Sequence, residues 1–273
     1  MLGPLGGGVP IPPAAGAAAH ALSTACRQAR SKSLNLAVVL FPGFELLDVA
    51  APGELLGAKP ELVTLTYCAL APGPVASSCM ELRGGAQGPS LLATHSLQKG
   101  GLISKSPSPG GASESGDGEP FKPHGILVPG GKGVRSEVQN LALLQWLREA
   151  ALGSEVIFTI CTGSWLLGAA GGLDTVSATS NKAALRDGHP QRAAPQVQWQ
   201  MNARWVEHER VLEDGVSQLV ITSSGVSAGG DAALALLARL GGLEVAHQVA
   251  HAAEWSWQED STIDPFAKAY GLS

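Results

Sequence analysis

Short runs of apolar residues alternate along the chain with stretches of helical periodicity. The apolar runs are rich in Val, Ile and Leu, as in strands that are buried on both faces of a parallel sheet. We predict such strands at Leu34–Leu40, Val63–Cys68, Ile126–Val128, Val156–Ile160 and Leu219–Thr222.

Amphipathic helices are predicted between these strands. Ser136 followed by Glu137 is typical of a helix start, and apolar residues follow at steps of three and four up to Ala151. A second helix is predicted over Asp231–Leu240, after a glycine-rich turn. Strands that alternate with helices predict an α/β fold, with a mostly parallel sheet covered by helices on both faces. In such sheets, ligands bind beyond the carboxyl ends of the strands.

Two segments depart from this pattern. Met1–Ser33 is rich in Ala, Gly and Pro and contains no Asp or Glu, which fits either a disordered extension or a transit peptide for import into a plastid or mitochondrion. Gln98–Lys122 has Gly, Pro or Ser at 14 of its 25 positions, which predicts a low-complexity surface loop. Residues 34–273, with this loop as an insertion, are therefore expected to form one α/β domain.

Composition narrows the function classes. The chain of 273 residues is 45% hydrophobic and has a net charge of −5, without the basic patch that nucleic-acid binding needs. Leu62–Met80 is long and uncharged, but its prolines and glycine argue against a membrane span. Cys26, Cys68, Cys79 and Cys161 lack zinc-site spacing, so we expect no metal and reduced thiols in an intracellular, cytoplasmic protein. Cys68 and Cys79, in or just after a strand, are interpreted as inert.

Cys161 stands where a predicted strand ends and a helix begins. Thr162, Gly163 and Ser164 supply the small residues that a tight strand-to-helix turn needs. The turn presents the sulfur at the ligand-binding end of the sheet and near the positive end of the next helix, where a thiolate is favoured. We therefore predict that Cys161 is a nucleophile; the alternative is a small, inert core residue.

Asp48 is an isolated carboxyl within the apolar helical stretch after the first strand. Desolvation there would raise its pKa, so that it could donate a proton and then act as a general acid and base. The alternative is an exposed aspartate on the helix surface. Glu45 and Glu54 are interpreted as ordinary solvated charges.

Another turn follows the strand that ends at Val128. Its two glycines would let backbone N–H groups approach a ligand, and Gly131 is the candidate for a second oxyanion donor. The turn lacks both the P-loop and the dinucleotide motifs, which argues against a nucleotide. The later turn Ser223–Gly230 either lines the same pocket or simply begins a helix.

Together these motifs resemble the ThiJ/PfpI family, part of the class I glutamine amidotransferase-like superfamily. The resemblance runs in order over Leu34 to about Phe266. It rests on F-P-G-F-E-L-L-D-V-A-A-P (41–52), I-L-V-P-G-G-K-G (126–133), I-C-T-G-S-W-L-L-G-A-A-G (160–171), V-S-A-T-S-N-K (176–182) and T-S-S-G-V-S-A-G-G-D (222–231).

The resemblance implies a flavodoxin-like fold, a homodimer and a site with no cofactor. The family's elbow cysteine matches Cys161 and its acidic partner matches Asp48, although most members have Glu there. An aspartate combined with C-T-G is most similar to the isonitrile hydratase branch, which implies pocket and oxyanion roles for Thr162 and Gly131. Gly163 and Asn181 are counted with them as oxyanion or pocket positions. Many members have a histidine where this chain has Asn181, so a Cys-His-acid triad is not expected.

Three functions follow from these residues. The first is a cysteine-dependent lyase that hydrates an isonitrile to an N-formamide. The second is a glutathione-independent glyoxalase or deglycase that acts on methylglyoxal. The third is a redox-sensing or protective protein whose cysteine is oxidised rather than turned over. For the two enzymes the expected partner is a small electrophile.

Overall fold

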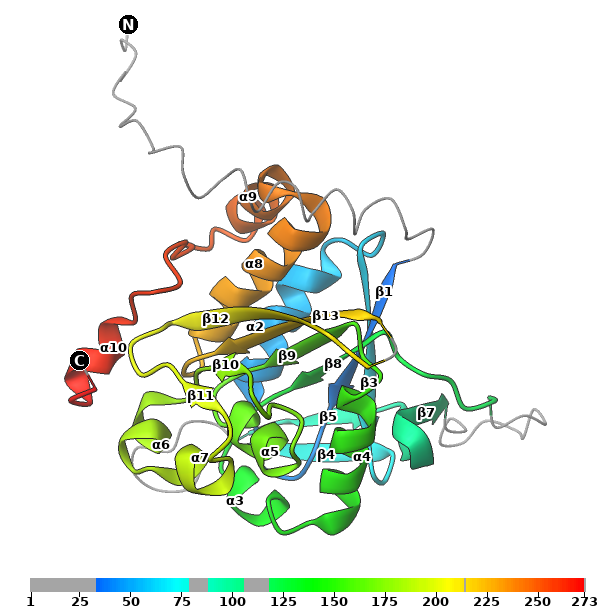
Figure 1. Ribbon diagram of the computed structural model, residues 1–273. Coiled ribbons are helices and arrows are strands. Elements are labelled where there is room, and N and C mark those ends of the chain that lie inside the picture. Colours follow the sequence, from blue (N-terminus) through cyan, green and yellow to red (C-terminus); the bar gives the residue numbers. More distant parts are fainter. Residues whose placement is uncertain (1–32, 79–87, 106–117, 214, 273) are drawn as a thin grey trace, which may run out of the picture.

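A computed structural model describes residues 33–78, 88–105, 118–213 and 215–272. Within these residues an eight-stranded sheet forms the centre of the fold (Figure 1). From edge to edge its strands are β12 (Trp205–Val211), β13 (Ser217–Ser223), β9 (Val156–Thr159), β8 (Gly125–Val128), β1 (Leu34–Val39), β3 (Val63–Ala69), β6 (His95–Gln98) and β7 (Leu102–Lys105). The edge strands β12 and β7 are antiparallel to their neighbours, and all strands between them are parallel.

Helices cover both faces of this sheet, as predicted. In Figure 1, one layer lies above the strands and another lies below them. The upper layer contains α2 (Leu46–Gly57), α8 (Ala228–Gly241) and α9 (Leu243–Ala252). The lower layer contains α3 (Val134–Glu137), α4 (Leu141–Ala151), α5 (Gly163–Ala169), α6 (Lys182–Arg186) and α7 (His189–Ala193).

The central strands are apolar because both of their faces are covered. Every residue of β8 and β9 is buried, and Asn35 is the one residue of β1 that is not. Burying a Val, Leu or Ile side chain in this way contributes about 1.5–3 kcal/mol. The hydrophobic core therefore lies on both faces of the inner strands.

The strand order places a crevice beside β1. Numbered along the chain, β1, β3, β8, β9 and β13 have the spatial order 2-1-3-4-5 of flavodoxin-like folds, which confirms the predicted fold class. The chain leaves β1 toward β3 on one side, and later fills the other side with β8 and β9. Ligands bind at such a switch point, beyond the carboxyl ends of the strands.

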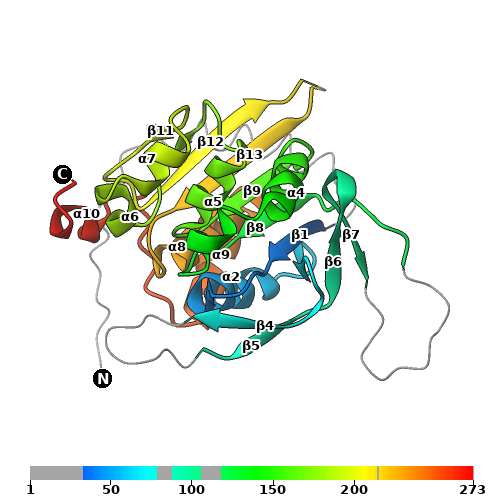
Figure 2. The same ribbon diagram turned by 90° about the horizontal axis from the view of Figure 1, so that it is seen from below.

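Smaller elements lie at the flanks of the molecule. Figure 2 shows β4 and β5 on one flank and α6, α7 and the C-terminal helix α10 (Pro265–Ala269) on another. The short strands β2 (Phe44–Glu45), β4 (Gly73–Ser78) and β5 (Ser90–Ala93) form one small sheet, and β10 (Ser177–Ala178) pairs with β11 (Gln198–Trp199).

The helix predicted from Ser136 to Ala151 is two helices. α3 ends at Glu137, and α4 begins after Asn140, whose side chain accepts the N–H of Leu143 at 3.3 Å as an N-cap. An N-cap asparagine starts a new helix because it satisfies an otherwise unpaired N–H group. The Ser136–Glu137 pair therefore lies at the end of α3 and does not cap α4.

The segment Gln98–Lys122, expected as a surface loop, begins with regular structure. A 3₁₀ turn, η1 (Lys99–Gly101), leads into β7, which pairs with β6 and with Phe121 through Ile103. Ile103 is fully buried, so the few apolar residues of this segment form the sheet edge. Residues 106–117 lie outside the described residues, as do 1–32 of the predicted N-terminal extension.

Candidate active site

Cys161 follows β9 in a strained turn. Its φ is 56°, a left-handed conformation that a residue with a Cβ seldom adopts. Its N–H donates to the carbonyl oxygens of Ser223 (3.2 Å) and Ser224 (2.9 Å). Its own carbonyl accepts the hydroxyls of Ser164 (3.1 Å) and Ser180 (3.0 Å). These hydrogen bonds hold the backbone in the geometry of a nucleophile elbow.

Gly163 allows α5 to start directly behind this elbow. A Cβ at this position would overlap the carbonyl oxygen of Val128, so only glycine lets the turn pack against the end of β8. The Gly163 N–H donates to the Ile160 carbonyl at 2.8 Å. Gly163 therefore shapes the turn, while its own N–H is already engaged.

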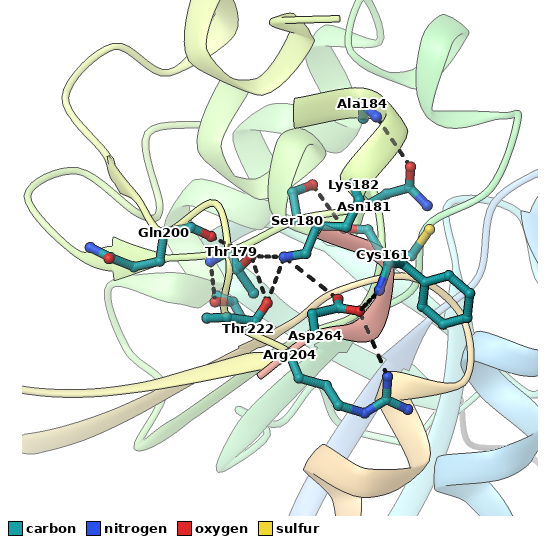
Figure 3. A network of polar contacts seen from close by, with 12 residues as sticks. Cys161, Thr179, Ser180, Asn181, Lys182, Ala184, Gln200, Arg204, Thr222 and Asp264 are labelled. Carbon is teal, nitrogen blue, oxygen red and sulfur yellow. Dashed lines mark hydrogen bonds and ion pairs between the residues drawn. The ribbon is translucent and has the colours of Figure 1, made fainter. Parts of the chain in front are cut away.

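Three hydrogen-bond donors face the Cys161 sulfur. They are the backbone N–H groups of Thr162 and Val226 and the side-chain amide of Asn181. Asn181 is the N-cap of α6, where its Oδ1 accepts the Ala184 N–H at 3.1 Å, so the Nδ2 group is left to donate to the sulfur (Figure 3). The pocket role predicted for Asn181 thus has a geometric basis.

Asp48 lies in α2 and is completely buried. Its Oδ2 accepts the N–H of Gly130 at 2.8 Å, whereas its Oδ1 has no hydrogen-bond partner among the described residues. Burial raises the pKa of Asp48 well above its ordinary range, and the nearby Glu45 charge adds to the effect. The predicted desolvation of Asp48 is therefore confirmed, and the alternative of an exposed aspartate is wrong.

Cys161 and Asp48 influence each other's charge. Burial raises the pKa of the Cys161 thiol, and the negative charge of Asp48 raises it further. The three donors to the sulfur lower this pKa, but burial outweighs them. The sequence analysis predicted that the start of α5 favours the thiolate, which means a lowered pKa of Cys161. The pKa is raised instead, so this prediction is wrong. Since like charges in a buried site repel, the pair can lose one proton far more easily than two.

Gly131 and Thr162 meet at the entrance to the turn after β8. The Gly131 N–H donates to Thr162 Oγ1 at 3.0 Å, and Gly131 has a φ of 128° that strongly favours glycine. Gly131 would serve as an oxyanion donor only after the Thr162 hydroxyl had turned away from it. The two predicted residues are adjacent, and their roles stay predictions.

Two residues of the site differ from the sequence interpretation. Glu45 is 8% exposed and its pKa is raised by burial, so it is not the solvated charge that we expected; it lies one turn before Asp48. Val226 was overlooked, although the turn that contains it was considered as pocket lining or as a plain helix start. The structure supports the first interpretation, because Ser227 at the N-cap of α8 makes no side-chain cap while Val226 faces the sulfur.

The part of the chain that is described contains no cluster of metal-ligating side chains. Within it, no three His, Cys, Asp or Glu residues lie close enough together to hold a metal ion. No helix in the same residues is both long and apolar enough to cross a membrane.

Comparison with known proteins gives a consistent family result. The model of the DJ-1/PfpI family matches residues 35–239, which include both Asp48 and Cys161. An isonitrile hydratase of Pseudomonas putida is 28% identical over 218 residues, which cover 80% of this chain and 76% of the relative.

Solved structures share the fold at lower sequence identity. A ThiJ/PfpI family protein from Pseudomonas syringae superposes with a TM-score of 0.60 at 20% identity, covering 88% of this chain and 85% of the other. DJ-1beta of Drosophila melanogaster superposes with a TM-score of 0.55 at 19% identity, covering 82% of this chain and all of the other. These likenesses establish the fold.

Proposed function

The chain belongs to the DJ-1/PfpI family, and from this premise we propose that it is a cysteine-dependent lyase that hydrates a small electrophile without a cofactor. The substrate class that we propose is an isonitrile, R–NC, and the product is the N-substituted formamide. Similarity to the isonitrile hydratase of Pseudomonas putida supports this choice.

One observation carries the proposal: the thiol of Cys161, in its strained turn, interacts with the buried carboxyl of Asp48, and an asparagine faces the sulfur. The Oδ1 of that carboxyl has no hydrogen-bond partner among the described residues. Hydration of an isonitrile requires protons to reach the terminal carbon and then the nitrogen of one small molecule. A single carboxyl can supply both, since it regains a proton from water between the two steps. A histidine is not needed.

The first half of the reaction forms a covalent bond to sulfur. The Cys161 thiolate attacks the terminal carbon of the isonitrile, and the protonated Asp48 carboxyl gives its proton to the same carbon. The product of this step is a thioimidate, Cys–S–CH=N–R, beside an Asp48 carboxylate. The thiolate forms when the Cys161 thiol passes its proton to the Asp48 carboxylate, so that the pair keeps the single negative charge that their mutual repulsion permits.

The second half of the reaction releases the product with water. The Asp48 carboxylate takes a proton from water while the hydroxide adds to the thioimidate carbon, and Asp48 then passes that proton to the nitrogen. The C–S bond breaks as the carbonyl forms, and the hydroxyl proton returns to Asp48. One R–NC and one H₂O give R–NH–CHO, and the site regains its initial charge state.

The test is formamide production from an alkyl isonitrile by purified wild-type protein and by the Cys161→Ala variant. We expect turnover by the wild type and a loss of at least about 10³-fold in the variant, since the covalent route is removed. Cys68→Ala is the matched control, because Cys68 is also buried but donates its thiol to the Val38 carbonyl in a regular strand.

Substantial turnover by Cys161→Ala would contradict the mechanism. No turnover of isonitriles by the wild type would contradict the substrate class. Lactate formed from methylglyoxal without glutathione would in that case favour the glyoxalase function of the same cysteine.

A further inference from the structure

Four charged side chains form a buried chain behind the Cys161 pocket. They are Lys182, Asp264, Arg204 and Asp231, which come from four segments far apart in the sequence. Each is at most 9% exposed. The proposed reaction uses none of them, and none is a donor to the sulfur.

The first two members brace one wall of the pocket. This wall is the segment Thr179–Lys182, in which Ser180 holds the Cys161 carbonyl and Asn181 faces the sulfur. Lys182 Nζ fastens the wall by donating to Thr179 Oγ1 at 2.9 Å and to the Ala203 carbonyl at 2.5 Å (Figure 3).

The other two members brace a second wall, the turn Ser223–Ser227. This turn accepts the Cys161 N–H and presents the Val226 N–H to the sulfur. The carbonyl of Arg204 accepts the Ser224 N–H at 2.8 Å. The guanidinium of Arg204 donates to Ser227 Oγ at 3.4 Å and, from Nε, to Asp231 Oδ2 at 2.6 Å.

Asp264 connects the two braces. Its Oδ2 lies 3.6 Å from Lys182 Nζ, and its Oδ1 lies 4.0 Å from an Arg204 nitrogen (Figure 3). Two hydrogen bonds hold Asp264 in place. Its N–H donates to the Asn202 carbonyl, and its Oδ1 accepts the Phe266 N–H as the N-cap of α10. A residue of the C-terminal segment thus joins the supports of both walls.

We propose that Asp264 is a positioning residue for Cys161: by joining Lys182 to Arg204 it fixes the two walls that present the Asn181 amide and the Val226 N–H to the sulfur. The proposal rests on the proposed function only in that it assigns Cys161 as the reacting group. Hydrogen-bond donors stabilise a thiolate only when they are held at the right distance, so loosened walls would disfavour the thiolate.

A positioning role and a simple charge effect predict opposite results. Asp264 is an anion, so replacing it with a neutral residue would, through charge alone, make the thiolate easier to form. Lys182 does not cancel this effect, because burial lowers its pKa to about 8 and it is therefore already neutral at the higher pH where the Cys161 thiol, whose pKa is raised, titrates. A rise in the pKa of Cys161 would therefore report displaced donors.

The experiment is an ultraviolet titration of the Cys161 thiolate in wild type and in Asp264→Asn. Each spectrum is corrected by subtracting that of the same protein with Cys161→Ala. The introduced asparagine keeps an oxygen for the Phe266 cap, and we expect the midpoint to rise by about one pH unit, which is about tenfold less thiolate at any lower pH. Asp260→Asn is the matched control in the same segment, since Asp260 is exposed and accepts the N–H and the hydroxyl of Thr262.

An unchanged or lowered midpoint in Asp264→Asn would overturn the proposal. A midpoint that moves equally in Asp260→Asn would overturn it as well. If Asp264→Asn does not fold, the double variant Lys182→Met/Asp264→Asn, which leaves neither partner as an unpaired buried charge, is compared with Lys182→Met alone, and a higher midpoint in the double variant is expected. The titration needs no substrate, so it stays decisive even if the protein does not hydrate isonitriles.

Discussion

Asp48 and Asp231 are both buried carboxyls beside the Cys161 pocket, but they have different neighbours. Asp231 faces the guanidinium of Arg204 and also accepts the indole N–H of Trp255 at 2.9 Å. Asp48 receives one backbone N–H and leaves an oxygen without a partner among the described residues. A carboxyl that is paired with a cation braces the fold, whereas one without a cation holds a proton that chemistry can use.

Asp48→Asn gives the largest effect that the comparison predicts. Asparagine can still accept the Gly130 N–H, but it cannot give and regain a proton. We expect turnover of the isonitrile to fall by about 10²–10⁴-fold, the usual contribution of a general acid–base group. Steady-state kinetics measure this, and a variant that retains a tenth or more of the wild-type rate would remove Asp48 from the mechanism.

Arg204→Met tests whether the pairing of Asp231 with Arg204 stabilises the fold. It leaves Asp231 and Asp264 without a shared cation, and breaking a buried pair from one side costs about 3–5 kcal/mol of the free energy of unfolding. Urea denaturation measures the loss. Arg186→Met is the control: Arg186 pairs with Asp187 at the surface, where both side chains are more than 40% exposed, so no measurable loss is expected.

The smallest effect concerns the stability of Asp48→Asn. A raised pKa means that folding holds the Asp48 proton more tightly, so the wild type loses stability as pH rises above the ordinary value of 3.8. Asparagine does not titrate, so the variant should become more stable relative to the wild type as pH rises from 3.8 to neutrality. Near pH 3.8 the difference should vanish; a difference independent of pH would contradict the assignment.

The centre of the fold was predictable because its signal is local. β1, β3, β8, β9 and β13 are apolar runs, and their predicted and observed ends agree within two residues. The edge strand β12 was not predicted, because its middle is the polar run E-H-E-R on a partly exposed surface. The loop interpretation of residues 98–105 failed because composition outweighed two apolar residues, Leu102 and Ile103, that pair at the sheet edge.

The settings of Cys161 and Asp48, the two residues of the proposed reaction, were predictable for a similar reason. Cys161 is at a strand-to-helix turn, and Asp48 is a single charge in an apolar helical stretch. The same reasoning applied to α8 would have identified Asp231, a single charge before A-A-L-A-L-L. Its partners could not be found in this way, because Arg204 and Asp264 meet only through tertiary packing.

The strained backbone at Cys161 has a consequence for protein engineering. A left-handed residue with a Cβ costs of order 1 kcal/mol, and the buried Asp48 carboxyl, whose Oδ1 has no partner among the described residues, adds to that cost. A redesign that optimises this backbone for thermostability alone would replace Cys161 with glycine and Asp48 with an apolar residue. These two substitutions would relieve the fold but remove the proposed chemistry, so both positions have to be held constant in any stabilised version of the chain.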